Sequence, residues 1–146
     1  MLTKKQIEKI RQFNRDYTEL LGVLNKKIFN TDLSWPEGRI LIEIGLNDLL
    51  TPMMISKKLK MDKSYVSRII TKLAKKELLV KIPSTKDSRS VEIKLTDKGK
   101  EVWKKVNEAS NKQVENWLKD FDSNQQEEFF EALEIVNKLL KENGDF

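Results

Sequence analysis

The sequence predicts a mostly α-helical fold with one small antiparallel β-hairpin near its middle. Apolar residues recur at three- and four-residue steps along most of the 146-residue chain, as they do in amphipathic helices. Over residues 79–95 the step changes to two, which is typical of strands. The length fits one folding unit with a hydrophobic core of its own, and the sequence contains no repeat or linker that divides it.

Two helices are expected before the centre of the chain. Thr3 and Gln6 have the spacing of a capping box, and helical apolar spacing continues from there to about Phe29. One long helix is therefore predicted over this range. The Trp-Pro pair at residues 35–36 marks a break and restart, and the apolar residues after it predict a short second helix that ends near residues 47–48.

A pair of short helices joined by a tight turn is predicted next. Thr-Pro at residues 51–52 is the signature of a helix start, and this third helix extends to about Leu59. Asp62 is placed to cap a fourth helix that extends to about Lys76. The apolar stripe of the fourth helix consists of Val66, Ile69, Ile70 and Leu73. Its opposite face is left to polar side chains.

The hairpin and two further helices complete the chain. The predicted elements are strands over residues 79–83 and 90–95, a connecting loop at 84–89, a fifth helix from residues 96–97 to about Phe121, and a sixth helix that opens with a capping box at Ser123 and Gln126. The first, fifth and sixth helices carry more apolar surface than one small lobe readily covers. We therefore expect a homodimer, with closure of a core within one chain as the alternative.

The basic residues are concentrated in one third of the chain. Residues 51–100 contain 14 Lys and Arg against 5 Asp and Glu, a net charge of +9, whereas the remainder carries −4. Such a segment suits a surface that neutralises phosphates. Helix, turn, helix and basic hairpin, in this order, are the layout of a winged helix-turn-helix, in which one helix enters the major groove of DNA.

The candidate DNA contacts lie on the fourth helix and on the hairpin loop, or wing. A helix in the major groove needs short or rigid polar groups near its N-terminus, with longer cations beside them. The residues expected to contact DNA are Lys63, Ser64, Tyr65, Ser67, Arg68, Thr71 and Lys72 on the helix, and Lys86, Ser88 and Arg89 on the wing. Arg68 suits either guanine O6 and N7 or a phosphate. Asp87 is expected to brace the wing, or else only to form its turn.

The wing and the residues after it resemble the MarR family of bacterial transcription regulators. Asp87-Ser88-Arg89, followed by Leu95-Thr96-Asp97-Lys98-Gly99, matches that family's Asp-x-Arg wing and Leu-Thr-x-x-Gly helix entry, and residues 66–73 are similar to its recognition helix. The resemblance implies a homodimer whose first, fifth and sixth helices interlock, with two winged lobes on a pseudo-palindromic operator. It assigns residues 1–33 and 100–146 to dimerisation and 34–99 to DNA binding, within a single MarR-like domain over 1–146.

The resemblance also implies a small-molecule effector. Many family members respond to amphipathic or phenolic ligands bound between the dimer helices and the DNA-reading lobe. The candidate pocket residues here are Phe13, Tyr17, Trp35, Arg39 and Trp103. Aromatic residues at helical spacing also suit a hydrophobic core, and this alternative stays open.

The composition excludes several kinds of chemistry. The chain contains neither Cys nor His, which rules out disulfides and thiolate zinc sites and removes the commonest metal ligand and general base. We therefore expect no metal, no cofactor and no enzymatic activity. No apolar run approaches the ~18 residues of a membrane span, so we expect a cytoplasmic protein without a membrane partner.

Together these features predict a sequence-specific DNA-binding transcriptional regulator. We expect a repressor rather than an activator, because blocking a promoter asks less of the protein. Its expected partners are double-stranded DNA, a second copy of the chain and, if it has an effector, a small molecule that releases it from the operator. Two alternatives stay open: a protein-interaction module and a non-specific DNA-organising protein, each on a winged-helix scaffold.

Overall fold

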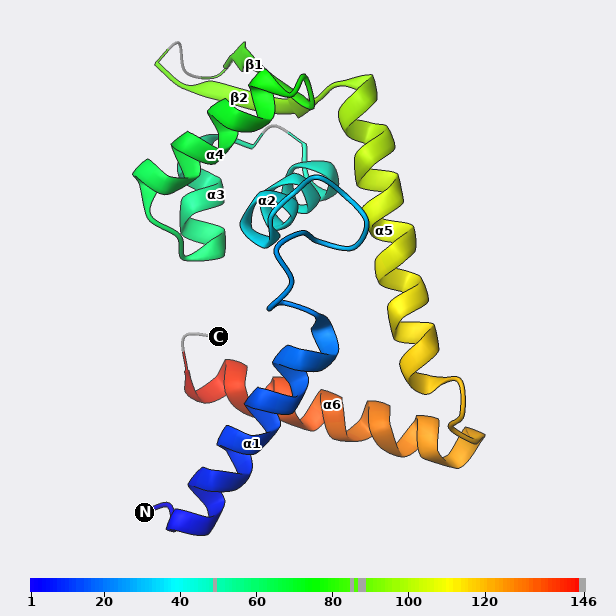
Figure 1. Cartoon of the computed structure of the whole chain (residues 1–146). Helices are drawn as coiled ribbons and strands as arrows, with labels where there is room; N and C mark the ends of the chain where they lie inside the picture. The colour runs from blue at the N-terminus through cyan, green and yellow to red at the C-terminus, as the bar shows by residue number, and fades with distance from the viewer. Residues whose placement is uncertain (49, 85, 87–88, 145–146) are drawn as a thin grey trace. The chain divides into compact units, whose positions relative to one another are not determined.

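The computed structural model describes residues 1–48, 50–84, 86 and 89–144, and it confirms a mostly helical fold with one small antiparallel hairpin. The chain divides into two compact units, residues 1–108 and 109–146. The first unit contains α1 (Lys4–Leu21), α2 (Trp35–Leu46), α3 (Pro52–Leu59), α4 (Lys63–Lys75), β1 (Leu79–Pro83), β2 (Val91–Leu95) and the first half of α5 (Asp97–Leu118) (Figure 1). The second contains the rest of α5 and α6 (Ser123–Asn143).

The hydrophobic core of the first unit lies where α2, α3, α4 and the hairpin meet. Each of these elements contacts at least two of the others. The predicted apolar stripe of α4 is buried in this core, together with Ile40 and Leu41 of α2 and Ile55 of α3. Burial of this one stripe therefore fixes which face of α4 is turned outward.

The first helix is shorter than predicted. It ends at Leu21, and Gly22 adopts the left-handed conformation with φ +79°. The Gly22 N–H donates to the Glu19 carbonyl at 3.0 Å, and the Val23 N–H donates to the Thr18 carbonyl at 3.3 Å, which caps the helix. The predicted continuation to about Phe29 is wrong, because this cap turns the chain and places Ile28 in the core.

The two central short helices begin and end as predicted, to within one residue. The Thr51 hydroxyl accepts from the Met54 N–H at 3.2 Å, and the Asp62 carboxylate accepts from the Tyr65 N–H at 3.1 Å. Between them Lys60 takes a left-handed conformation, with φ +51°, and the Ser56 hydroxyl donates to the Met61 carbonyl at 2.6 Å. These caps set the turn of the helix-turn-helix.

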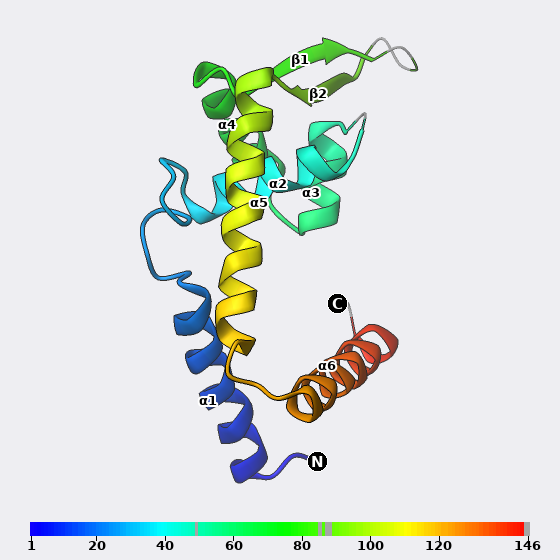
Figure 2. The ribbon, with the colours of Figure 1, turned by 90° about the vertical axis from the view of Figure 1, so that its right-hand side faces the viewer.

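The hairpin extends away from α4 and α5, as Figure 2 shows. Its strands are antiparallel, with Leu79 opposite Leu95 and Pro83 opposite Val91, so the second strand begins one residue later than predicted. Leu79 and Ile93 are buried against the core, and the Ile93 N–H donates to the Leu50 carbonyl at 2.7 Å. The core therefore holds the base of the wing.

The entry to α5 explains the Leu-Thr-x-x-Gly motif. The Thr96 hydroxyl donates to the Glu77 carbonyl at 2.6 Å and accepts from the Gly99 N–H at 3.0 Å. A Cβ on Gly99 would overlap the backbone carbonyl of Leu78. The motif thus allows the first turn of α5 to lie directly against the turn that follows α4.

The second unit begins α6 with a different cap from the one predicted. Asp122 and Gln125 form the capping box, not Ser123 and Gln126. A carboxylate at the helix N-terminus also interacts favourably with the helix dipole, which favours Asp122 over Ser123 as the cap. Phe129 stacks edge-on against Phe121 and Phe130, with ring centroids 5.9 and 5.8 Å apart.

Candidate nucleic-acid interface

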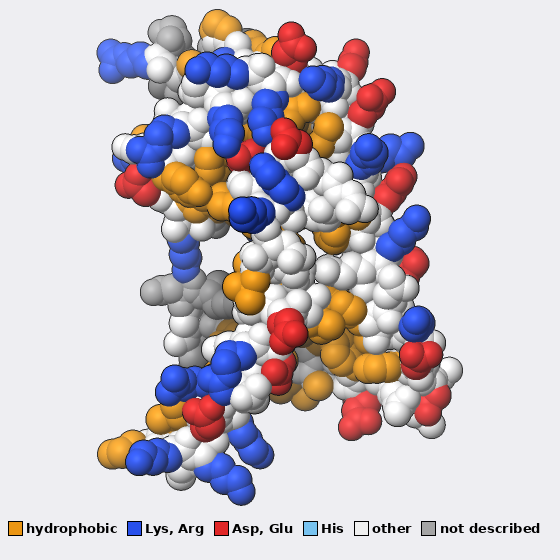
Figure 3. Space-filling view, in the orientation of Figure 1, with side chains coloured by type: hydrophobic (Ala, Val, Ile, Leu, Met, Phe, Trp, Pro, Cys, Tyr) orange, Lys and Arg blue, Asp and Glu red, His pale blue; other side chains and the backbone are white. Residues whose placement is uncertain are grey.

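The polar face of α4 is open to solvent. All seven predicted contact residues on this helix are exposed: Lys63, Ser64, Tyr65, Ser67, Arg68, Thr71 and Lys72. In Figure 3, Lys and Arg side chains gather over the part of the molecule that contains α4 and the hairpin. A helix that buries one apolar face and exposes the opposite polar face is suited to recognition of the major groove.

Arg68 and Tyr65 form a pair on this face. The guanidinium carbon of Arg68 lies 5.8 Å from the centroid of the Tyr65 ring, within the range of a cation–π contact. The two side chains belong to the first two turns of α4, where base edges come closest in a major-groove complex. The contact favours a position of the guanidinium next to the Tyr65 ring.

The wing carries the predicted cations Lys86 and Arg89, and both are exposed. The Ser84 hydroxyl donates to Glu92 Oε1 at 3.1 Å and accepts from the Lys86 N–H at 3.2 Å. Sequence reasoning missed this role of Glu92, which is buried. Asp87 and Ser88 lie outside the described residues, so the bracing role of Asp87 and the contact role of Ser88 stay predictions.

Two buried carboxylates on α2 also bind lysines of the helix-turn-helix. Glu43, whose side chain is 3% exposed, lies 2.5 Å from Lys58 Nζ on α3 and 3.4 Å from Arg39 Nη1. Glu37, whose side chain is 5% exposed, binds Lys72 of α4 and Lys76, the C-terminal cap of that helix. The sequence analysis did not predict these ion pairs. Two acidic residues within the otherwise apolar α2 could have indicated them, because a buried acid needs a basic partner.

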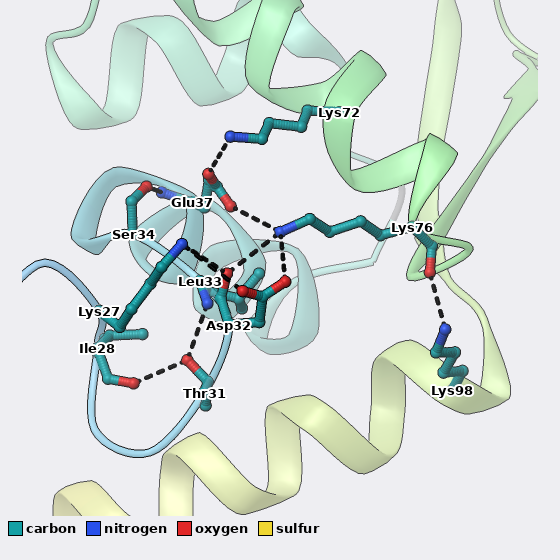
Figure 4. A network of polar contacts seen from close by, with 10 residues as sticks. All are labelled: Lys27, Ile28, Thr31, Asp32, Leu33, Ser34, Glu37, Lys72, Lys76 and Lys98. Atoms are coloured by element: carbon teal, nitrogen blue, oxygen red, sulfur yellow. Dashed lines mark hydrogen bonds and ion pairs between the residues drawn. The ribbon is translucent and has the colours of Figure 1, made fainter.

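The Glu37 contacts form a network at the C-terminal end of α4 (Figure 4). Glu37 Oε1 lies 2.9 Å from Lys72 Nζ, and its Oε2 lies 3.5 Å from Lys76 Nζ. Lys76 also lies 3.4 Å from Asp32, on the loop between α1 and α2, and Asp32 in turn lies 3.6 Å from Lys27. Lys72, a predicted DNA contact, is therefore in an ion pair within the protein.

The pKa values of this network are consistent with charged partners. Burial alone would raise the pKa of the Glu37 carboxyl, but the Lys72 hydrogen bond and the attraction of Lys76 and Lys72 together hold it below its ordinary value. The hydrogen bond to Glu37 raises the pKa of Lys72, and the hydrogen bond from Lys76 lowers that of Asp32. All three groups are charged at neutral pH.

These ion pairs change how the basic segment is understood. Lys58, Lys72 and Lys76 belong to the segment of net charge +9, but their acidic partners Asp32, Glu37 and Glu43 lie outside it. The lobe thus neutralises part of the charge that its central sequence carries. Lys63, Arg68, Lys86 and Arg89 are exposed and are candidates for phosphate or base contact.

The predicted effector residues have identifiable contacts in the structure. Phe13 and Tyr17 stack on each other on α1 at 5.4 Å between centroids. The Trp35 indole N–H donates to the Gly22 carbonyl at 3.1 Å, and Arg39 pairs with Glu43. The Trp103 indole N–H donates to the Ile42 carbonyl at 3.3 Å.

Trp103 also lines a cleft of about 560 Å³ between the end of α2, β2 and the start of α5. Apolar side chains and three lysines share its wall. The lining residues are Ile44, Gly45, Asn47, Asp48, Ile93, Lys94, Leu95, Lys100, Trp103 and Lys104. Phe13, Tyr17, Trp35 and Arg39 are not among them, so the cleft differs in composition from the pocket that the sequence predicted.

The first and last helices expose large apolar side chains. On α1 these are Ile7, Ile10, Phe13, Tyr17 and Leu20, and on α6 they are Phe129, Phe130, Leu133, Ile135, Val136, Leu139 and Leu140. Neither helix contains a buried residue. Each of the two helices therefore exposes several large apolar side chains that this chain alone does not cover.

Over residues 1–48, 50–84, 86 and 89–144, no cluster of three or more acidic side chains is arranged to hold a metal ion. Within the same ranges, no helix combines the length and apolarity needed to cross a membrane.

A helix-turn-helix followed by a two-stranded wing makes the chain a winged helix-turn-helix protein. The MarR family model matches residues 31–90. The HTH-type transcriptional regulator BilQ of Clostridioides difficile (strain CD3) is 27% identical over 99 residues, which cover 68% of this chain and 67% of BilQ. The matched residues include α2, α3 and α4, and over them the chain resembles the MarR family of winged-helix regulators.

Solved structures share this fold. Streptococcus pneumoniae FabT, crystallised in complex with DNA, matches with a TM-score of 0.80 at 19% identity, over 93% of this chain and 98% of FabT. A mutant of E. coli MarR complexed with operator DNA matches with a TM-score of 0.72 at 20% identity, over 93% of this chain and 98% of that one.

Proposed function

We propose that the protein is a sequence-specific DNA-binding repressor that acts as a homodimer on a pseudo-palindromic operator. The observation that carries the proposal is the exposed polar face of α4, with Arg68 held on Tyr65 and a basic wing in the same lobe. The DNA complexes of the similar FabT and MarR structures support duplex DNA as the partner. In this proposal α4 enters the major groove and the wing reaches an adjacent minor groove.

The dimer is proposed from the apolar faces of α1 and α6. Covering these faces with a second copy of the same chain removes them from water, which stabilises the assembly by about 25 cal/mol for each Å² of apolar area buried. A two-fold dimer presents two α4 helices and therefore reads an inverted repeat, with half-sites about one DNA turn apart.

Repression and its release are proposed on mechanical grounds. A dimer seated on a promoter blocks access without contacting any other protein. The dimer is proposed to have two forms that differ in the distance between their α4 helices, of which only one fits the operator. An effector that binds the other form more tightly shifts the dimers toward that form and so weakens operator binding. A small amphipathic or phenolic molecule is the proposed class of effector.

The first experiment is a selection of fragments bound by the protein from genomic DNA, followed by a titration against bulk competitor. We expect at least a thousandfold preference for a selected inverted repeat, as in specific complexes generally. Sedimentation of the complex is expected to give two chains for each site. Equal affinity for selected and bulk DNA would favour a DNA-organising protein, and absence of binding would favour a protein-interaction module.

We expect Arg89→Ala to weaken binding to all duplexes and to reduce the slope of log affinity against log salt by about one. The change removes one cation from the proposed minor-groove contact, so fewer counterions are released on binding. Fluorescence anisotropy over a salt series measures the slope. Lys119→Ala, which removes an exposed cation outside the proposed interface, is the control and should leave the slope unchanged.

A further inference from the structure

Ser64, Arg68 and Lys72 occur four positions apart on α4, and Lys76, the C-terminal cap of the helix, continues the same row. Its first two members belong to the proposed DNA contact region. Its last two bind the buried carboxylate of Glu37 through different oxygen atoms. One row therefore joins the proposed DNA contacts to an anchor inside the protein.

From this arrangement we propose that Glu37 is a positioning residue for DNA recognition, and that Lys72 and Lys76 serve as its anchors rather than as DNA contacts. The inference rests on the proposed function of α4. We call Glu37, Lys72, Lys76 and Asp32 the Glu37 clamp. Two bonds from one carboxylate to residues one turn apart fix the rotation of α4 about its axis, and with it the direction of Arg68.

Burial explains why a carboxylate here determines geometry more than stability. The cost of removing the Glu37 carboxylate from water offsets much of its attraction to the two lysines, which stay partly in contact with solvent. The attraction still favours one arrangement strongly, because a helix rotation that withdraws either lysine leaves a buried charge incompletely paired. Glu37 is itself buried on α2 and belongs to the protein interior rather than to the exposed face of α4.

The clamp also connects α4 to two other elements. Lys76 Nζ donates to the Asp32 carbonyl at 3.2 Å, on the loop that follows α1, and Lys98 Nζ of α5 donates to the Lys76 carbonyl at 3.2 Å (Figure 4). Both contacts are at the C-terminal end of α4. A displacement of the loop between α1 and α2 would therefore be transmitted to the direction of the recognition helix.

The test compares salt dependence and specificity in the full-length protein. The probes are the selected operator duplex and a scrambled duplex of the same length, each titrated by fluorescence anisotropy over a potassium chloride series. We expect Glu37→Gln to reduce the ratio of operator to scrambled affinity about tenfold, a coupling of ordinary size for contacting groups. Because it frees Lys72, whereas Lys76 keeps its contacts with Asp32, it should also steepen the salt slope on scrambled DNA by up to about one.

Lys72→Met, made alone and together with Glu37→Gln, gives a second readout. In the wild-type background it should leave the salt slope unchanged, because the ammonium is already paired. In the Glu37→Gln background it should lower the slope by about one. Glu77→Gln is the matched control, since it removes one exposed acid from the turn after α4. It should change neither the ratio of operator to scrambled affinity nor the effect of Lys72→Met on the salt slope.

The outcomes separate the clamp from the proposed function. A wild-type protein that does not prefer the operator would overturn the proposed function itself. A wild-type protein that prefers it, with Glu37→Gln unchanged in both ratio and slope, would overturn the clamp alone. Circular dichroism shows whether Glu37→Gln folds. If it does not, Lys72→Met alone decides: a decrease of about one in the slope of log affinity against log salt would show that Lys72 contacts phosphate and would overturn the clamp.

Discussion

Replacing Gly99 by alanine is expected to lower the free energy of unfolding by about 3 kcal/mol, at the upper end of the usual cost of overpacking. The added methyl group would overlap the carbonyl oxygen of Leu78, which is backbone and cannot rotate away. Alanine is a better helix former than glycine by up to ~1 kcal/mol, and this gain is smaller than the cost of the overlap. The first turn of α5 would have to move off the lobe.

Gly38→Ala is the matched control for this prediction. Gly38 is also a buried helical glycine, but the atoms nearest its added methyl group belong to the Ile28 side chain, at 2.9 Å. A side chain can adjust where a backbone carbonyl cannot, so the loss at Gly38 should be the smaller one. Urea unfolding followed by circular dichroism measures both, and equal losses would show that the Leu78 carbonyl is not the cause.

The expected cost at Gly99 also indicates what the Leu-Thr-x-x-Gly motif does. Thr96 bonds to the Glu77 carbonyl and to the Gly99 N–H, and Gly99 allows the close approach to Leu78. Every one of these contacts is within the protein. The motif that most sharply suggested the family is therefore a packing device that joins α5 to the winged lobe.

Local signals in the sequence were enough to predict the central helices. Thr51 and Asp62 are good caps with apolar stripes directly after them, so the ends of α3 and α4 were determined by residues close in sequence. The end of α1 was missed for the opposite reason. Apolar residues at helical spacing continue past Gly22, and a glycine within such a pattern does not by itself show whether the chain takes a left-handed turn there.

The candidate site was predictable only in part. Helical spacing separates the two faces of α4, so the exposed polar face followed directly from the positions of its apolar residues. The ion-pair partners of Lys72 and Lys76 could not be predicted from the sequence. Asp32 and Glu37 are at least 35 residues away from these lysines and come into contact with them only because α2 packs against α4. Counting charges along the sequence therefore overstated the cations that α4 offers to DNA.

Arg68→Ala is expected to reduce operator affinity by about 1–3 kcal/mol, roughly 5- to 150-fold, with the loss concentrated at particular base pairs. The guanidinium is held over Tyr65 in the region of α4 that comes closest to base edges, and guanine O6 and N7 accept its two parallel N–H donors. The measurement is fluorescence anisotropy against operators that each carry one base-pair change. Wild-type discrimination at the contacted G·C pair should disappear in the variant.

Arg68→Lys distinguishes the shape of the arginine from its charge. Lysine retains the cation but lacks the rigid fork, so a base contact should remain largely lost, whereas a phosphate contact should be largely restored. A uniform loss in Arg68→Ala over every operator and over scrambled DNA, repaired by lysine, would assign Arg68 to the DNA backbone. Because Arg68 lies one turn before Lys72, a base contact also requires the orientation that Glu37 gives to α4, so Arg68→Ala and Glu37→Gln should be less than additive on the operator.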